Sequence, residues 1–256
     1  MPQRELLRAK YDAQLRTEAE VRGAQDIQRF GPLWIARFAA DELFVTYQNL
    51  DRPAELVAHV AALIAADTAI ASAEWKTRSH DDAPGLEAAL TAAGFTPGEP
   101  ESVMLGEATQ LIGASTPAGV TVRQLTQPDE IRAALEMQDF VFGSAFAERM
   151  LTEILRRQAR GDRLEIWAAE ADGRIVSAGR IDPIAGTEFA GIWGGATLPE
   201  YRGRGIYRAL TAARVRSAQA QGVRWIHSDS TEFSRPILER SGLLKVTETV
   251  PWTFER

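Results

Sequence analysis

The sequence of 256 residues predicts an α/β fold with a mixed sheet, organised as two similar parts. Short apolar segments of strand length alternate with segments whose apolar residues recur at helical spacing. A stretch of small residues, Gly113-Ala114-Ser115-Thr116-Pro117-Ala118-Gly119, interrupts this alternation near the middle of the chain. We therefore place residues 1–112 in one domain, residues 113–119 in a linker and residues 120–256 in a second domain.

A short internal repeat supports the idea that the two domains are related. Asp81, Leu90 and Gly94 align without a gap with identical residues 148 positions later in the chain. The identities are few, but they fall on a predicted strand end, a predicted helix and the glycine that ends this helix. We interpret the N-terminal domain as a degenerate copy of the C-terminal one.

The elements of the N-terminal domain follow from apolar periodicity. Leu7, Tyr11 and Leu15 recur at a spacing of four, which is typical of an amphipathic helix. We expect a helix over Arg4–Arg22, strands over Leu33–Phe38, Leu43–Gln48, Ala69–Arg78 and Ser102–Glu107, and helices that begin at Pro53 and span Leu86–Ala93.

The C-terminal domain contains more strands, and its turns are better marked. Asp172-Gly173 separates two strand candidates and is a strong signal for a tight hairpin. We expect strands over Val120–Leu125, Leu164–Ala169, Arg174–Ile181, Glu188–Leu198, Val223–Ser228, Leu244–Thr247 and Thr249–Phe254, and helices over Pro128–Phe142 and Ala147–Arg160, from the turn after Leu198 to Gln221, and from Ser234 to Arg240.

Composition excludes several classes of protein. The chain has no cysteine, so disulfides, a thiolate nucleophile and cysteine-bound metals are ruled out. Its three histidines are scattered, and we expect no metal site. A net charge of −6 argues against nonspecific binding to nucleic acid. No apolar run reaches membrane-spanning length, so we expect a cytoplasmic protein without a membrane partner.

The segment Arg202-Gly203-Arg204-Gly205-Ile206-Tyr207 lies between a predicted buried strand and a predicted helix. Its two glycines allow main-chain N–H groups to turn toward a ligand where a side chain would block the approach. The helix N-terminus adds a partial positive charge, and the arginines add whole ones. This combination predicts a binding site for a polyphosphate.

This segment resembles the acyl-CoA signature of GNAT-type N-acetyltransferases, which is Arg/Gln-x-x-Gly-x-Gly/Ala after a strand. Arg202 and Gly205 match the signature, whereas Tyr207 replaces its last small residue. The order of elements from Val120 to Phe254 is also similar to this fold. The segment from Ser234 to Leu243 is similar to the late helix of the family and the Gly-Phe pair after it.

The resemblance implies acetyl-CoA as co-substrate, bound along one strand and the turn after it. The implied cofactor-binding residues are Ala196, Thr197, Leu198, Arg202, Gly203, Arg204, Gly205, Ile206, Tyr207 and Ser234. The main-chain amides from Gly203 to Tyr207 would hold the diphosphate, and the strand residues would bond the pantetheine amides. The resemblance also implies that the strands ending near Leu198 and Ser228 splay apart to admit the thioester.

Catalysis by direct attack requires a base, because alkyl amines are mostly protonated near neutral pH. The candidates are Glu188, which opens a strand, and Asp229 and Glu232, which follow the next strand. Each also has a structural interpretation: an exposed strand end for Glu188, a turn cap for Asp229 and a surface charge for Glu232. Many family members place a tyrosine in the late helix as a general acid, but the matching residue here is Leu238.

The sequence therefore predicts an N-acetyltransferase that moves an acetyl group from acetyl-CoA to a small-molecule or protein amine. We expect a monomer or homodimer. The alternative is a non-catalytic module that binds acyl-CoA, which the leucine at 238 and the unassigned base both favour. A Rossmann-type nucleotide site is disfavoured, because neither a Gly-x-Gly-x-x-Gly start nor a Walker lysine is present.

Overall fold

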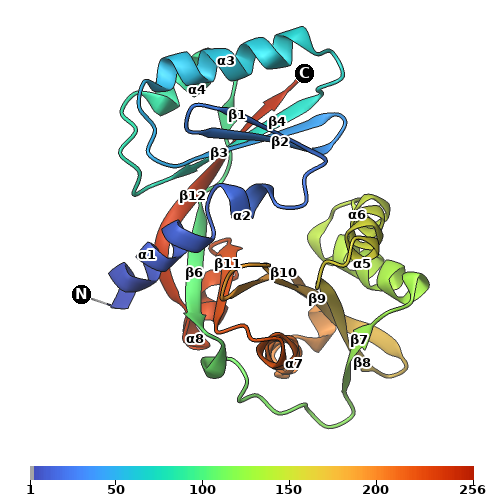
Figure 1. The fold of residues 1–256 in the computed structure, drawn as a ribbon. Coiled ribbons are helices and arrows are strands. Elements are labelled where there is room, and N and C mark those ends of the chain that lie inside the picture. Colours follow the sequence, from blue (N-terminus) through green and yellow to red (C-terminus); the bar gives the residue numbers. More distant parts are fainter. Residues whose placement is uncertain (1–2) are drawn as a thin grey trace. The chain divides into compact units, whose positions relative to one another are not determined.

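Helices and strands are interspersed along residues 3–256, which the computed structural model describes (Figure 1). Contacts divide the chain into two compact units. The first contains the described residues through Met104 together with Asp229–Ile237 and Leu244–Arg256. The second contains Leu105–Ser228 and Leu238–Leu243. The C-terminal segment thus contributes to the unit that the N-terminal half builds.

The first unit contains a mixed sheet in the order β1-β2-β3-β4-β12, with β5 paired to β12. Its strands β3 and β4 are parallel, whereas β1–β2, β2–β3 and β4–β12 are antiparallel. The elements are α1 (Gln3–Gln14), α2 (Glu18–Val21), β1 (Asp26–Phe30), β2 (Leu33–Ala39), β3 (Glu42–Tyr47), α3 (Pro53–Ala66), β4 (Ser72–Arg78), α4 (Leu86–Ala92), β5 (Thr96–Pro97) and β12 (Leu244–Glu255).

The core of the first unit lies between this sheet and the helices α3 and α4 (Figure 1). Leu56, Val57, Val60 and Ile64 follow helical spacing along one side of α3 and are at most 5% exposed. They pack on Trp75 of β4, which is completely buried. This apolar layer fixes the register of β3 against β4, because a slip of one residue would turn it toward solvent.

The second unit contains a sheet in the order β11-β10-β9-β8-β7. Only β10 and β11 are parallel; the other neighbours are antiparallel. The elements are η1 (Ala108–Gln110), β7 (Thr121–Leu125), α5 (Pro128–Phe142), α6 (Ala147–Ala159), β8 (Glu165–Ala171), β9 (Arg174–Pro183), β10 (Phe189–Thr197), η2 (Pro199–Tyr201), α7 (Ile206–Ala220) and β11 (Trp225–Ser230), while β6 (Glu101–Glu107), the end of β11 and α8 (Arg235–Arg240) are shared between the units.

Helices cover both faces of the second sheet: α7 lies on one face, and α5 and α6 lie on the other (Figure 1). Gly179 of β9 faces Arg214 of α7, whereas Gly194 of β10 faces Gln138 of α5. The core is built from residues of α5, α6 and β7 to β10. Asp172 and Gly173 both adopt positive φ between β8 and β9, so the predicted hairpin is confirmed.

The two units repeat one arrangement, in which parallel strands are joined through a helix. β3, α3 and β4 form it in the first unit, and β10, α7 and β11 form it in the second. The helices α4 and α8 also end alike. Phe95 N–H donates to the Leu90 carbonyl at 3.0 Å, and Leu243 N–H donates to the Leu238 carbonyl at 3.1 Å. The predicted α/β fold with a degenerate N-terminal copy is confirmed.

Some elements differ from the expectation. Strand β1 was not predicted, because its mostly exposed residues show no apolar alternation; a turn at Gly31 pairs it with β2. The predicted strands Leu244–Thr247 and Thr249–Phe254 form one continuous strand, β12. The predicted helix over Arg4–Arg22 is divided into α1 and α2 at Thr17, which has φ +57°.

The compact units also do not follow the linear boundary at 113–119. β12 pairs with β4 from Glu255↔Ser72 to Thr249↔Arg78, which places the end of the chain in the first unit. The boundary stays a prediction about the order of domains along the sequence. Over residues 3–256, no helix combines the length and apolarity that crossing a membrane requires.

Candidate functional site

The turn between β10 and α7 has the geometry that its glycines predict. Gly203 has φ +74° and Gly205 has φ +80°, which L side chains rarely adopt. A Cβ on Gly203 would meet nothing within 4 Å, so the space beside this residue is open. The backbone conformation, and not crowding by the protein, requires glycine there.

The main-chain amides of this turn are available for a ligand. The first helical hydrogen bond is donated by Ala209 N–H to the Gly205 carbonyl at 3.0 Å. Gly205 is the N-cap residue of α7 and makes no side-chain cap hydrogen bond. The N–H groups of residues 205–208 therefore have no acceptor within the helix, as at any helix N-terminus. The donors that a diphosphate needs are present.

Two arginines flank these amides. Arg202 Nε donates to the Thr197 carbonyl at 3.0 Å, which orients its side chain at the end of β10. The Arg204 guanidinium lies over the ring of Tyr201, 4.9 Å from its centroid. Both residues are exposed, so their positive charges face solvent beside the turn.

Tyr207 turns toward β10. A Cβ on Gly195 would lie 2.6 Å from Cε2 and 2.7 Å from the hydroxyl oxygen of Tyr207. The tyrosine at the position of the signature's last small residue is thus accommodated by a second glycine, Gly195, on the neighbouring strand. The large side chain at position 207 therefore requires a residue without a side chain at position 195.

The strand before the turn offers fewer main-chain groups than expected. Leu198 N–H donates to the Val176 carbonyl at 2.9 Å, and the Ala196 carbonyl accepts from Ser177 Oγ at 2.7 Å. These groups of Ala196 and Leu198 face β9, so the geometry does not support their predicted bonds to pantetheine. Because strand residues alternate in direction, Thr197 faces the other edge, where its N–H is the remaining donor.

β10 and β11 separate as the resemblance implied. Their pairing runs through Phe189↔Trp225, Ala190↔Ile226 and Gly191↔His227, and within the described residues it ends there. β10 then bulges between Trp193 and Ala196, where Gly194 has φ +59°. A bulge redirects the strand and leaves main-chain groups unpaired. Beyond Gly191 the ladder between β10 and β11 therefore ends, although Ser228 Oγ of β11 still donates to the Ile192 carbonyl at 3.1 Å.

Gln138 of α5 and Arg180 of β9 meet this bulge. Gln138 Nε2 donates to the Gly194 carbonyl at 2.5 Å. Arg180 Nη1 and Gln138 Nε2 lie 3.2 and 3.3 Å from the position that a Cβ on Gly194 would occupy. Sequence reasoning missed both residues. An arginine inside an otherwise apolar strand and a Gly-Gly pair in the next strand were the signals that pointed to them.

The predicted cofactor contact Ser234 lies in a local turn. Its Oγ donates to the Thr231 carbonyl at 3.3 Å and lies 3.3 Å from Thr231 Oγ1. Ser234 belongs to the first unit, whereas the glycine turn belongs to the second. Its predicted role stays a prediction.

Glu188 lies at the opposite end of β10 from the glycine turn. Nine residues separate it from Thr197, which corresponds to about 30 Å of extended strand. Its Oε1 accepts from Arg224 Nη1 at 2.9 Å, and its main-chain carbonyl receives the N–H groups of Arg224 and Trp225. The structure therefore does not bring Glu188 to the turn.

Asp229 and Glu232 belong to the first unit. The Asp229 carboxylate forms a short ion pair with Lys76, and its side chain is only 9% exposed. Asp229 and nearby acids raise the pKa of Lys76 above its ordinary value, although burial acts in the opposite direction. Lys76 thus stays protonated beside the Asp229 carboxylate. Glu232 is exposed.

The ion pair of Asp229 is part of a larger buried network in the first unit. Arg78 is completely buried and contacts the Glu20 carboxylate, Tyr11 Oη at 3.2 Å and Thr46 Oγ1 at 3.2 Å. Acidic partners raise its pKa, against the effect of burial. A cation that is removed from water is thus matched by a carboxylate.

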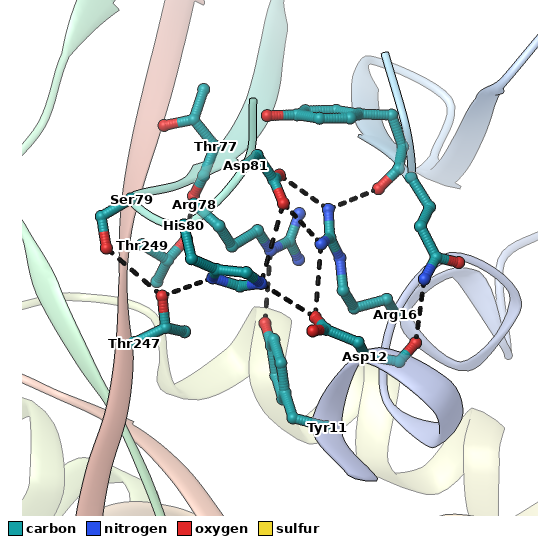
Figure 2. Close-up of polar contacts among 12 residues, drawn as sticks. Tyr11, Asp12, Arg16, Thr77, Arg78, Ser79, His80, Asp81, Thr247 and Thr249 are labelled. Atoms are coloured by element: carbon teal, nitrogen blue, oxygen red, sulfur yellow. Dashed lines mark hydrogen bonds and ion pairs between the residues drawn. The ribbon is translucent and has the colours of Figure 1, made fainter. Parts of the chain in front are cut away.

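Figure 2 shows the second part of this network, where α1 meets the ends of β4 and β12. Arg16 donates to both oxygens of Asp81 at 2.7 and 2.8 Å and to the Tyr47 carbonyl at 2.8 Å. His80 joins Asp12 Oδ1 at 3.0 Å to Thr247 Oγ1 at 2.6 Å. Asp12, His80 and Thr247 thus form a series of carboxylate, imidazole and hydroxyl groups. The Thr247 hydroxyl at its end belongs to a residue that is only 6% exposed, which favours a structural role over a catalytic one. We interpret this cluster as the anchor of α1.

Arg214, which is buried, and Arg180, which is half-buried, have different partners in the second unit. Arg214 is completely buried, and it donates to the Arg180 carbonyl at 3.0 Å and to Thr211 Oγ1 at 3.0 Å, both of which are neutral. Burial lowers its pKa. Burial also lowers the pKa of Arg180 to about 10. The negative charge of Asp182 acts to raise this pKa, whereas the positive charges of Arg157 and Arg214 act to lower it further. Both oxygens of Asp182 already accept from Arg157.

Comparisons with known proteins agree with this geometry. Residues 115–228 match a family model described as an acetyltransferase (GNAT) domain, which covers β7 to most of β11. No curated protein matches the chain by sequence.

Several solved structures share the whole fold. A GCN5-related N-acetyltransferase from Kribbella flavida has a TM-score of 0.70 and 19% identity, and the match covers 92% of this chain and 93% of that one. A conserved protein of unknown function from Staphylococcus epidermidis has a TM-score of 0.71 and 16% identity, covering 91% and 94%. A tandem GNAT protein from the clavulanic acid biosynthesis pathway has a TM-score of 0.63 and 18% identity, covering 89% and 81%.

Proposed function

We propose that the chain binds acetyl-CoA at the glycine turn and transfers the acetyl group to an amine, because residues 115–228 match a family model described as an acetyltransferase (GNAT) domain. One observation carries the proposal: the amides of residues 205–208 have no acceptor within α7, and the turn before them has space for a ligand. The residues present fit a diphosphate, which requires several N–H donors and nearby positive charge.

The other cofactor contacts follow from the edge of β10. Thr197 N–H would donate to a carbonyl of the pantetheine arm in a strand-like hydrogen bond, and Arg202 and Arg204 would supply positive charge near the diphosphate. The bulge at Gly194 opens the space between β10 and β11 for the thioester. A main-chain N–H on this edge would polarise the thioester carbonyl.

The amine must lose a proton before it attacks. Glu188, Asp229 and Glu232 stay the sequence-based predictions for the base that takes this proton directly or through water, although Glu188 lies at the end of β10 opposite the glycine turn. Thiolate is a good leaving group, so the reaction proceeds without an acid at the position that Leu238 occupies, where the side chain is only 3% exposed. We propose a small-molecule or protein amine as acceptor and transfer within a ternary complex.

The test begins with binding. Titration calorimetry of the full chain with acetyl-CoA should give saturable binding, and Gly205→Val should abolish it while the protein stays folded by circular dichroism. Gly222→Val is the matched control, because Gly222 also has a positive φ (+92°) but lies at the other end of α7. Unchanged affinity in Gly205→Val would contradict the diphosphate site.

Turnover is then measured as free thiol released from acetyl-CoA in the presence of a panel of amines. A non-catalytic module that binds acyl-CoA is the second candidate, because Leu238 is buried and Asp229 is held by Lys76. Binding without thiol release for any amine would favour this module. Amine-dependent release would favour the enzyme.

A further inference from the structure

Arg180 is a cation without a matching anion at the centre of the second unit. It lies on β9 opposite Trp193 of β10. Within residues 3–256 its guanidinium makes no hydrogen bond or ion pair, in contrast to Arg16 and Arg78 of the first unit. Arg180 is half-buried, and a guanidinium that is partly removed from water carries a cost unless a carboxylate or another acceptor satisfies it.

The surroundings of Arg180 do not supply this anion. Asp182, two residues along the same strand, accepts from Arg157 through both oxygens, at 2.8 and 2.7 Å. The other charged neighbours that act on Arg180 are Arg157 and Arg214, which are both cations. The Arg180 guanidinium instead lies against Gly194, with Nη1 3.2 Å from the position that a Cβ there would occupy.

The position of Arg180 places it beside the proposed reaction site. Its Nη1 approaches the β10 bulge at Gly194, where Gln138 Nε2 also converges. Residues opposite one another on paired strands share a face, so Trp193 lies on the same face as Arg180. The Trp193 ring extends over Gly191 and contacts the ring of His227, with 5.2 Å between centroids. The Trp193 ring therefore provides an aromatic surface on the sheet face that carries the Arg180 guanidinium.

Resting on the proposed function, we infer that Arg180 binds a carboxylate of the acceptor, so that the preferred acceptors are amines that carry a carboxylate, such as amino acids. The guanidinium is planar and presents paired N–H donors that fit a carboxylate in two parallel hydrogen bonds. The Gln138 amide lies beside it as a neutral donor, and Trp193 offers a surface for the acceptor's carbon skeleton. The acceptor's own anion completes a site that the protein leaves incomplete.

The experiment compares amines that differ only in the carboxylate. The pairs are phenylalanine with phenethylamine, and lysine with cadaverine. Calorimetry with the full chain, with and without CoA, measures binding, and thiol release measures kcat and KM. The wild-type protein should bind the acid of at least one pair at least about tenfold more tightly, as two charge-assisted hydrogen bonds imply.

Arg180→Met should remove this preference, and the loss should fall on KM more than on kcat, because the contact is made in the ground state as well. Arg180→Lys should restore part of it. Arg132→Met is the control, because Arg132 is an exposed residue of α5 that pairs with Asp129 and Glu148. A purely structural role for Arg180 would lower stability without changing the preference between the two members of a pair.

Several outcomes overturn the inference: equal binding of both members of every pair, absence of binding by any of them, or an unchanged preference in Arg180→Met. If inorganic phosphate or phosphoethanolamine binds more tightly than the carboxylates, and this binding depends on Arg180, the ligand group is a phosphate and the inference is also overturned. Failure of the proposed function looks different: carboxylates would still bind through Arg180, but no amine would release thiol from acetyl-CoA.

Discussion

The two units share one arrangement of parallel strands and helix, but they differ in the residues that follow and surround these strands. In the first unit, Arg16 donates to the Tyr47 carbonyl at the end of β3. The charges that gather there are compensated within the protein, as Figure 2 shows for Arg16 and Asp81. In the second unit, glycines open the corresponding turn, and Arg180 lacks an anionic partner.

The turns that connect the first parallel strand to its helix also differ between the two units. The residues between β3 and α3 contain no glycine, and Pro53 stands at the start of α3, where it contributes no N–H. The turn before α7 has Gly203 and Gly205 and free amides. This difference agrees with the proposal that the second unit holds the ligand site, whereas the paired charges of the first unit serve its stability.

The largest expected effect concerns the paired network. Arg78→Met leaves Glu20 buried without its cation, so the free energy of unfolding should fall by about 3–5 kcal/mol, as is typical when one partner of a buried ion pair is removed. Chemical denaturation measures the change. The control Arg52→Met, at an exposed pair with Glu55, should change stability by less than about 0.5 kcal/mol. A similar small effect for Arg78→Met would contradict the anchoring role.

The next effect separates the two turns. We expect one acetyl-CoA per chain, because, of the two corresponding turns, the one before α7 contains Gly203 and Gly205 with open space beside Gly203, whereas the one before α3 contains no glycine. Gly205→Val should abolish detectable binding, a loss of at least about 100-fold, since losing two charge-assisted hydrogen bonds costs about 3 kcal/mol. Calorimetry gives both the stoichiometry and the affinity. A stoichiometry of two, with one site surviving in Gly205→Val, would show that the first unit also binds the cofactor.

Arg180→Met tests the unpaired cation by stability. Burial depresses the pKa of Arg180 to about 10, so the folded state disfavours its charge at neutral pH. Replacing it with an apolar side chain of similar length should leave the free energy of unfolding unchanged or raise it by up to about 2 kcal/mol. Thermal and chemical denaturation measure this. A clear loss of stability would mean that the guanidinium has a structural partner in solution.

The smallest effect is a pH dependence in the anchor of α1. Hydrogen bonds from His80 and Arg16 hold the pKa of Asp12 below its ordinary 3.8, although burial opposes them. A carboxyl group with a depressed pKa stabilises the fold above its unfolded pKa, and this contribution is lost as the pH falls through the folded value.

Asp12→Asn should therefore be less stable than the wild type at pH 6, by up to about 1 kcal/mol, and the difference should shrink below about pH 4. Denaturation at several pH values measures it, with the exposed Asp82→Asn as control. A difference that does not vary with pH would place the effect of Asp12 in packing and not in its charge.

Most of the fold was predictable, because its elements carry local signals. Apolar periodicity marked α3 and α5, and the Asp172-Gly173 hairpin and the glycine turn carry their own φ preferences. Strand β1 has no apolar alternation and is defined only by its pairing with β2. The candidate site divides in the same way: the turn was predictable, whereas the roles of Gln138 and Arg180 depend on which side chains the bulge brings together.

By itself, the sequence determined the glycine turn and the duplicated order of elements, because backbone conformation and apolar spacing are properties of neighbouring residues. Only the tertiary structure decided that β12 completes the first unit and that Asp229 is held by Lys76. It also decided that the carboxylate near Arg180, that of Asp182, accepts hydrogen bonds from Arg157. Charge pairing joins residues far apart in the chain, such as Lys76 and Asp229, and no local pattern records which of them will meet.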